Sequence, residues 1–220
     1  MSLQDKLDAF KADFETNQAP AAAVEAFHRS NQDLIDRGLA DQALKAGDTA
    51  PDFSLKDSSG NDVSLRDALA KGPVVLTFYR GVWCPYCNME LQALQDALPE
   101  IEARGAQLLA ISLQGPENSR KSQRQNKLDF PILTDQGGDV SEQFGLRWTL
   151  QDYVIPVFQG FGVELPQIHG TDEWTLPMPA RYVIGTDGVI AYAEVNPDYT
   201  IRPEPSDMFP VLDKLAHVAA

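Results

Sequence analysis

Cysteine is scarce in this chain, which has only two among its 220 residues. So few thiols exclude the disulfide-dense scaffolds of small secreted domains. A chain of this length buries roughly 70% of its unfolded surface on folding, so it needs no cross-link for stability. The two cysteines, Cys84 and Cys87, stand close together. In a reducing cytosol such a pair is more often catalytic or metal-binding than structural, so we expect a cytoplasmic protein with a functional dithiol.

Positive charge is scarce as well, with 18 Lys and Arg against 32 Asp and Glu and a formal net charge of −14. Nucleic acid and anionic membrane surfaces would therefore be repelled. No apolar run approaches the roughly 18 residues of a membrane span. The amino-terminal stretch MSLQDKLDAFKADFE contains no apolar core of secretory length. We expect no nucleic-acid partner, no membrane association and no signal peptide.

Histidine is limited to His28, His169 and His217, which are scattered along the chain. A zinc site takes a complete tetrahedral set of Cys and His ligands. The three histidines offer no spacing that would complete such a set beside the two cysteines. The sequence therefore predicts no metal site.

Residues 1–45 are predicted to form a helical extension. Ser2 is suited to cap a first helix, Pro20 to open a second and Gly38 to end it. One face of the first helix carries apolar residues at helical spacing, namely Leu3, Leu7, Phe10 and Phe14. We interpret the extension as a packing or oligomer surface and assign it no chemistry.

Residues 46–220 are predicted to form the main domain, in which strand and helix patterns alternate. Such alternation predicts an α/β fold with parallel strands joined by crossover helices. Residues 181–195 have the pattern of a β-hairpin. Residues 146–178 are rich in aromatics, Gly and Pro without clear periodicity, and we expect an irregular insertion that can cover the site. The core pattern consists of strands at 73–80, 106–112 and 129–135 and helices from about 87 and over 117–127.

The dithiol lies between a predicted strand and a predicted helix, in FYRGVWCPYCNMELQAL. A cysteine at the first turn of a helix faces unpaired backbone N–H groups and the positive end of the helix dipole, which both stabilise a thiolate. In such motifs the thiol pKa drops from about 8.5 to between roughly 3.5 and 7.5. Cys84 is expected at that turn, with Pro85 tolerated as the first helical residue. Cys87 is placed to attack a mixed disulfide or sulfenic acid on Cys84 and form an intramolecular disulfide.

The chain resembles the thioredoxin-fold superfamily on its peroxiredoxin (AhpC/TSA) branch, over about residues 46–195. AGDTAPDFSL, the FYR before the first cysteine and YVIGTDGVI resemble peroxiredoxin segments, whereas CPYC resembles glutaredoxin and the preceding Trp83 resembles thioredoxin. LPMPA and NPDYTIRPEP are similar to segments of a peroxiredoxin-like group with a thioredoxin-type CxxC motif. The resemblance implies a thioredoxin-like fold, with a central mixed sheet flanked by helices.

The chain also departs from both patterns. Gly81 and Thr77 stand where peroxiredoxins carry their peroxide-binding threonine and its companion proline. Pro179 falls where peroxiredoxins have an activating arginine and where thioredoxins have a cis-proline. Phe78 replaces the buried acid of thioredoxins. The resemblance therefore leaves two activities open, a thiol-dependent peroxidase and a protein disulfide oxidoreductase, with a non-catalytic redox sensor as a third reading.

A peroxidase needs donors that stabilise the charge developing on the leaving oxygen, and arginine is the usual one. Arg80, Arg181 and Arg202 come from three segments that can converge near Cys84. Gly81 and the backbone N–H groups ahead of the helix can form a small anion-binding turn.

A disulfide oxidoreductase needs an exposed Cys84, an apolar rim from Trp83 and Tyr86, and Pro179 to align an extended partner chain. A long insertion obstructs a protein partner more than it obstructs a small peroxide. The sequence therefore favours the peroxidase.

The predicted peroxidase cycle needs no metal and no organic cofactor. Cys84 reduces hydrogen peroxide or an alkyl hydroperoxide, its sulfenic acid condenses with Cys87, and thioredoxin, glutaredoxin or glutathione reduces the disulfide. The oligomeric state stays open, with a homodimer as one option.

Overall fold

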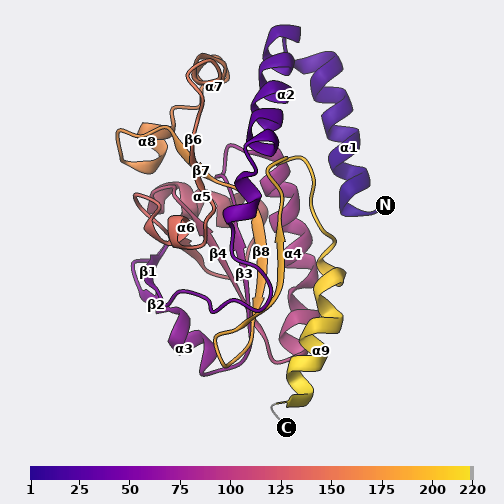
Figure 1. Ribbon diagram of the computed structural model, residues 1–220, viewed down its shortest axis with the longest axis vertical. Helices are drawn as coiled ribbons and strands as arrows, with labels where there is room; N and C mark the ends of the chain where they lie inside the picture. Colours follow the sequence, from indigo (N-terminus) through magenta and orange to yellow (C-terminus); the bar gives the residue numbers. More distant parts are fainter. Residues whose placement is uncertain (219–220) are drawn as a thin grey trace.

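The computed structural model describes residues 1–218 and has a mixed β-sheet with helices on both faces (Figure 1). Its strands lie in the order β2-β1-β5-β4-β3-β8-β9. The central strands β3 (Val74–Phe78), β4 (Gln107–Ser112) and β5 (Ile132–Thr134) are parallel, and β8 (Ala180–Ile184) is antiparallel to β3. The predicted α/β class with a central mixed sheet is confirmed.

The two edges of the sheet are hairpins. β1 (Ser54–Asp57) and β2 (Asp62–Ser64) form one edge, with β1 antiparallel to β5. β9 (Ile190–Val195) pairs with β8 at the other edge. The short helix α3 (Leu65–Leu69) follows β2 directly, and the Ser64 hydroxyl caps it by accepting a hydrogen bond from the backbone N–H of Asp67 at 3.0 Å.

Side chains of β3 alternate between two hydrophobic cores, as expected for a strand covered on both faces. Val75 contacts the core beneath α4 (Pro85–Ala103), whereas Val74 and Leu76 contact the opposite core. All five residues of β3 are buried. The strand therefore ends in the interior of the molecule, and this places the dithiol turn that follows it in the interior as well.

Four helices pack on the α4 face of the sheet. These are α1 (Leu3–Asp13), α4, α5 (Pro116–Asn126) and α9 (Phe209–Val218), as Figure 1 shows for α1, α4 and α9. α3 and α6 (Asp139–Gln143) contribute to the core on the other face. The helices predicted over 117–127 and after the dithiol are thus present, with α4 beginning earlier than position 87.

The extension packs on the main domain near both of its ends. Ser2 caps α1, because its hydroxyl accepts from the Asp5 N–H at 3.0 Å while the Asp5 carboxylate accepts from the Ser2 N–H at 2.9 Å. Leu7 of α1 is fully buried in the α4 core. Leu34 of α2 (Ala21–Asp36) is buried in the core on the opposite face. A π-helical turn, Phe14–Gln18, connects the two helices.

The segment 146–178 is more ordered than expected. It contains the two-stranded antiparallel sheet of β6 (Arg147–Thr149) and β7 (Thr175–Pro177) and the short helices α7 (Ile155–Gly160) and α8 (Leu165–His169). A small hydrophobic core of its own stabilises it. Elements of three to six residues are too short to produce a readable hydrophobic period, so the sequence did not reveal them.

The loop before α9 ties the two ends of the chain together. Glu204 is the N-cap residue of the 3₁₀ turn that leads into α9. The same Glu204 carboxylate accepts from the backbone N–H of Leu3 at 2.5 Å, and the backbone N–H of Arg202 donates to the Gln4 side chain at 3.0 Å. The position of α1 is therefore coupled to that of this loop.

None of the helices within residues 1–218 combines the length and the apolar character needed to cross a membrane.

We expect the Leu7→Ala variant to lose about 2–5 kcal/mol of unfolding free energy, because the side chain is fully buried between α1 and α4. Urea denaturation measures the loss, and Lys6→Ala, an exposed neighbour on the same helix, is the matched control. Equal effects of the two substitutions would show that the extension does not share the core of the main domain.

Candidate active site

Cys84 lies in the turn between β3 and α4 and is the N-cap residue of α4, with extended backbone angles. Pro85 is the first helical residue, as predicted. The Cys84 N–H donates to the Gly81 carbonyl at 3.1 Å, and the Asn88 amide donates to the Val82 carbonyl at 2.8 Å. These two bonds fix the turn, so that the first cysteine starts the helix and the second lies one turn into it.

Gly81 is required by the geometry of this turn. Its φ of +147° is unfavourable for other residues, and a Cβ there would lie 2.5 Å from Nε1 of Trp83. The expected anion-binding role is not observed for two of the amides, because the Val82 N–H donates to Gln114 at 2.9 Å and the Cys84 N–H donates within the turn. Gly81 thus shapes the site without presenting these amides to a ligand.

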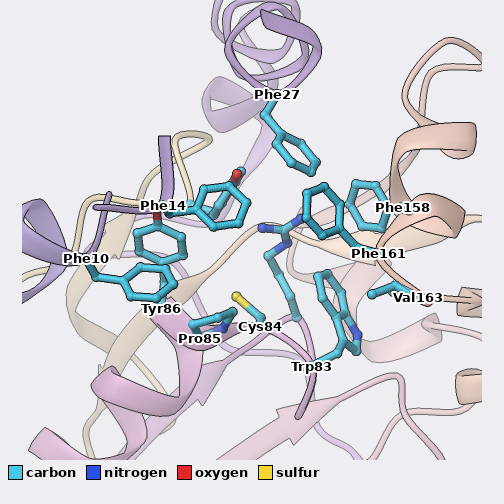
Figure 2. Close-up of a pocket in the computed structure, with 12 residues that line it drawn as sticks. Phe10, Phe14, Phe27, Trp83, Cys84, Pro85, Tyr86, Phe158, Phe161 and Val163 are labelled. Atoms are coloured by element: carbon cyan, nitrogen blue, oxygen red, sulfur yellow. The ribbon is translucent and has the colours of Figure 1, made fainter. Parts of the chain in front are cut away.

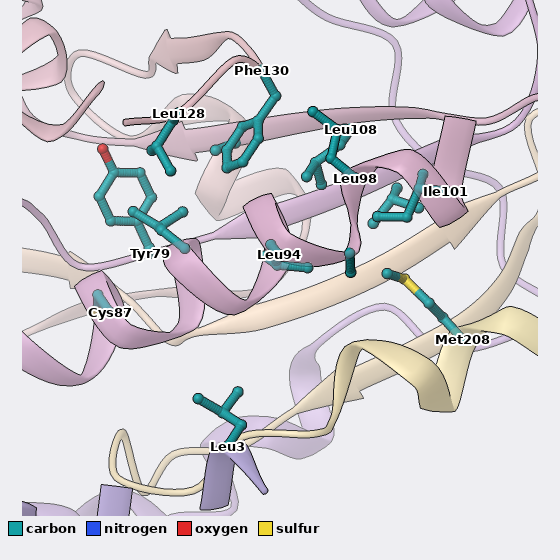
Figure 3. Packing of buried hydrophobic residues seen from close by; sticks show 14 of the residues in the cluster. Leu3, Tyr79, Cys87, Leu94, Leu98, Ile101, Leu108, Leu128, Phe130 and Met208 are labelled. Carbon is teal, nitrogen blue, oxygen red and sulfur yellow. The ribbon is translucent and has the colours of Figure 1, made fainter. Parts of the chain in front are cut away.

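Both thiols are buried, with Cys84 1% and Cys87 0% exposed. The exposed Cys84 that a protein disulfide oxidoreductase requires is therefore not observed. Its sulfur lies instead at the base of a cavity of about 200 Å³, with Phe14 on one side, Phe161 on the other and Phe27 above them (Figure 2). Cys87 points into the core beneath α4, where Tyr79 is among its neighbours (Figure 3).

The walls of this cavity come largely from the extension and from the segment 146–178. The extension supplies Phe10, Phe14 and Phe27, and the segment 146–178 supplies Phe158, Phe161 and Val163. The extension, interpreted from the sequence as a packing surface without chemistry, thus also contributes apolar rings to the cavity wall. Its apolar helical face pointed to packing, but a face pattern does not reveal whether the neighbour is a core or a cavity. The remaining lining residues are Arg80, Trp83, Cys84, Pro85, Tyr86 and Tyr199.

Arg80 is a buried cation in the cavity wall, only 4% exposed. Its guanidinium carbon lies 3.8 Å from the ring centre of Tyr199 and 4.9 Å from that of Trp83. Within residues 1–218 it forms no ion pair with a carboxylate, and its Nε has no hydrogen-bond partner. Aromatic faces therefore hold the charge in place while leaving it uncompensated.

Arg202 lies beside the second cysteine, with Nη2 at 3.9 Å from the Cys87 sulfur. Its Nε donates to the Glu90 carboxylate at 2.5 Å, and Arg181 donates to the other oxygen of the same carboxylate at 2.8 Å. All three charged side chains are at least 95% buried. Arg80 and Arg202 thus lie near the dithiol, whereas Arg181 is connected to it only through the Glu90 carboxylate that it shares with Arg202.

The surroundings of the dithiol shift the pKa values of the two thiols in opposite directions. Burial by itself raises the pKa of Cys84, but a hydrogen bond from the Cys87 thiol, the positive charges of Arg80 and Arg202 and the Cys87 N–H together lower it to about 6. Burial and the neighbouring Cys84 sulfur raise the pKa of Cys87 well above the ordinary value. The surroundings therefore favour the thiolate at Cys84 and the thiol at Cys87.

Two residues considered from the sequence lie outside the cavity. Pro179 is buried just before β8 and does not line it, and no peptide bond within residues 1–218 is cis, so the thioredoxin-like cis-proline is not present at this position. His169 is buried in α8, where burial lowers its pKa to about 4 and keeps it neutral at pH 7.

Glu90, Tyr199 and Gln114 are site residues that the sequence did not suggest. Glu90 had a readable signal, because it lies on the same face of the predicted helix as Cys87 and Leu94, where a carboxylate needs a buried partner. Tyr199 and Gln114 lie in loops whose approach to the dithiol depends on the tertiary fold. In the part of the chain described, no cluster of three or more His, Cys, Asp or Glu is placed to hold a metal ion.

The sequence profile of the AhpC/TSA family matches residues 46–193. The chain is 34% identical over 117 residues to peroxiredoxin Bcp of Escherichia coli (strain K12), which covers 53% of this chain and 74% of that protein. It is 28% identical over 185 residues to the chloroplastic peroxiredoxin Q of Triticum aestivum, which covers 84% of this chain and 75% of that protein. The chain therefore belongs to the AhpC/TSA family.

Solved structures share the fold at lower sequence identity. Peroxidoxin BcpB from Mycobacterium tuberculosis has a TM-score of 0.61 and 24% identity, with 80% of this chain and 99% of that chain covered. A peroxiredoxin-like protein from Aquifex aeolicus has a TM-score of 0.60 and 17% identity, with 79% and 88% covered. This likeness concerns the fold alone, and it confirms the predicted thioredoxin-like architecture.

Alkylation of reduced protein by iodoacetamide should show the lowered pKa of Cys84. Because the thiolate is the nucleophile, the rate should fall about tenfold per pH unit below the pKa of about 6 and be nearly constant well above it. Arg80→Met should move the midpoint upward, whereas Arg66→Met, at an exposed arginine, should leave it unchanged. Mass mapping of labelled Cys84 against pH measures this, and a midpoint near that of a simple thiol, about 8.5, would contradict the assignment.

Glu90→Gln should destabilise the protein by about 3–5 kcal/mol, because it leaves two buried guanidinium groups without their shared carboxylate. Glu100→Gln on the same helix is the control, since its side chain is 63% exposed and its solvent-screened pair with Arg104 should contribute little to stability. Denaturant titrations of both variants decide the matter. Similar losses would mean that the Glu90 pairs are not structurally important.

Proposed function

We propose that the protein is a thiol-dependent peroxidase in which Cys84 is the attacking thiolate and Cys87 the resolving thiol. Membership of a family whose relatives include peroxiredoxins supports an oxidoreductase of this class. The observation that carries the residue assignment is the Cys84 sulfur at the base of a small cavity, with two arginines beside the dithiol.

In the first step the Cys84 thiolate attacks the terminal oxygen of a hydroperoxide. An S–O bond forms and the O–O bond breaks, so that the sulfur is oxidised to a sulfenic acid and the remaining oxygen leaves as an alkoxide or hydroxide that takes up a proton. Arg80 lines the cavity and carries an uncompensated charge, which suits it to stabilise the leaving oxygen. Arg202, beside the dithiol, favours the thiolate before attack.

In the second step the Cys87 sulfur attacks the Cys84 sulfenic acid, which gives a disulfide and water. Two electrons from an external thiol reductant then restore both cysteines, and the reductant leaves as its own disulfide. We propose thioredoxin, glutaredoxin or glutathione for this role and a reducing, cytoplasmic location where such reductants are present. The cycle uses no metal or organic cofactor, and a homodimer stays compatible with it.

The disulfide oxidoreductase reading is disfavoured by the burial of Cys84 at 1% exposure, since a protein substrate must present its disulfide directly to that sulfur. A small hydroperoxide needs only the cavity.

Reduced protein should consume hydroperoxide stoichiometrically in stopped-flow assays that follow tryptophan fluorescence. Cys84→Ser should abolish the reaction because the nucleophile is removed. Cys87→Ser should still react once but accumulate a sulfenic acid, which dimedone traps and mass spectrometry detects, because no resolving thiol remains.

Peroxide consumption no faster than that of a free thiol, together with efficient reduction of insulin disulfides, would overturn this assignment and select the disulfide oxidoreductase. Turnover of neither substrate would select the redox sensor.

A further inference from the structure

The cavity above Cys84 is enclosed largely by aromatic rings. We call it the aromatic chamber, and its rings belong to Phe10, Phe14, Phe27, Trp83, Tyr86, Phe158, Phe161 and Tyr199. The rings contact one another across chain segments: the Phe14 and Phe161 centres are 5.7 Å apart, and the Phe27 centre lies 5.9 Å from those of Phe158 and Phe161. The chamber is therefore a continuous apolar surface rather than a set of isolated contacts (Figure 2).

Reaction with hydrogen peroxide does not require such a surface. Hydrogen peroxide is small and polar, and moving it from water to an apolar wall removes hydrogen bonds without replacing them. Three of the rings come from the extension, which lies outside the residues matched by the family profile. The extension thus completes a chamber whose other rings, apart from that of Tyr199, lie within the matched residues, and the surface of the chamber suits a ligand with an apolar body.

The size of the chamber limits that body. An apolar protein cavity of about 150 Å³ binds benzene. The aromatic chamber, at about 200 Å³, has room for one benzene ring and a short branched alkyl group. A long acyl chain exceeds this volume.

Cys84 and Arg80 supply the charged groups of the chamber. Cys84 is at the base, and the uncompensated guanidinium of Arg80 is in the wall against Tyr199 and Trp83. A ligand with one reactive polar end and one compact apolar end therefore has a single favourable orientation. The hydroperoxide group would face Cys84 and Arg80, and the ring would lie against the mutually packed rings of Phe14, Phe27 and Phe161.

We propose that the aromatic chamber is a specificity subsite for compact arylalkyl hydroperoxides, an inference that rests on the proposed peroxidase function. With cumene hydroperoxide, the Cys84 sulfur takes the terminal OH as the O–O bond breaks. The cumyl alkoxide takes up a proton and leaves as 2-phenyl-2-propanol. The electrons come from the thiolate, and the reductant of the proposed cycle later replaces them.

Phe161 is the most suitable residue to change, because it is 42% exposed and its loss should not prevent folding. Stopped-flow rate constants with cumene hydroperoxide and with hydrogen peroxide give a selectivity ratio. Phe161→Ala should lower this ratio roughly 3- to 10-fold through the cumene hydroperoxide rate. Phe161→Tyr, which keeps a ring, should restore it. Ile35→Ala, an exposed apolar residue of the extension outside the chamber, is the matched control.

Binding of 2-phenyl-2-propanol, the product alcohol, tests the subsite without turnover. At millimolar concentration it should raise the melting temperature of reduced wild-type protein and of Ile35→Ala, but not that of Phe161→Ala. Such binding in a protein that consumes no peroxide would support the chamber and overturn the peroxidase. A selectivity ratio unchanged by Phe161→Ala in an active enzyme, or the absence of alcohol binding to the wild type, would overturn the subsite.

Discussion

The negative charge on the Cys84 sulfur is the feature on which the rest of the site depends. A buried thiolate is unfavourable unless nearby groups stabilise it, and here the Cys87 thiol, its backbone N–H and two arginines do so. Arg80, Arg181 and Arg202 bring three positive charges to the interior, and Glu90 and the thiolate bring two negative ones. The resting site therefore keeps one positive charge within a chain of net charge −14. This excess is what a leaving oxygen would meet.

The fold holds these charges through contacts between distant parts of the chain. Glu90 accepts hydrogen bonds from Arg181 and Arg202, which stand 91 and 112 positions further along the chain. Helix α4, strand β8 and the loop before α9 therefore converge on one carboxylate. The same loop carries Tyr199, which packs against Arg80, and Glu204, which binds the start of α1. The loop before α9 therefore contacts both the extension and the buried arginines, and it holds the chamber wall in position relative to the dithiol.

The sequence predicted the parts of this arrangement that depend on local chemistry. The apolar runs at 73–80 and 106–112 showed the central strands, and the motif with Pro85 showed that a helix starts at the first cysteine. Sequence alone did not show what the apolar face of α1 contacts, because periodicity identifies a face but not its neighbour. The helix face of Glu90 indicated that the carboxylate needs a buried partner, but it did not identify Arg181 and Arg202, which reach Glu90 only after the sheet has formed.

Both sulfurs belong to one turn at the start of α4. Joining them is therefore a unimolecular event whose rate does not depend on how much protein is present. Dilution, or separation of any assembled copies, would leave the product of that event the same, because each chain carries both sulfurs.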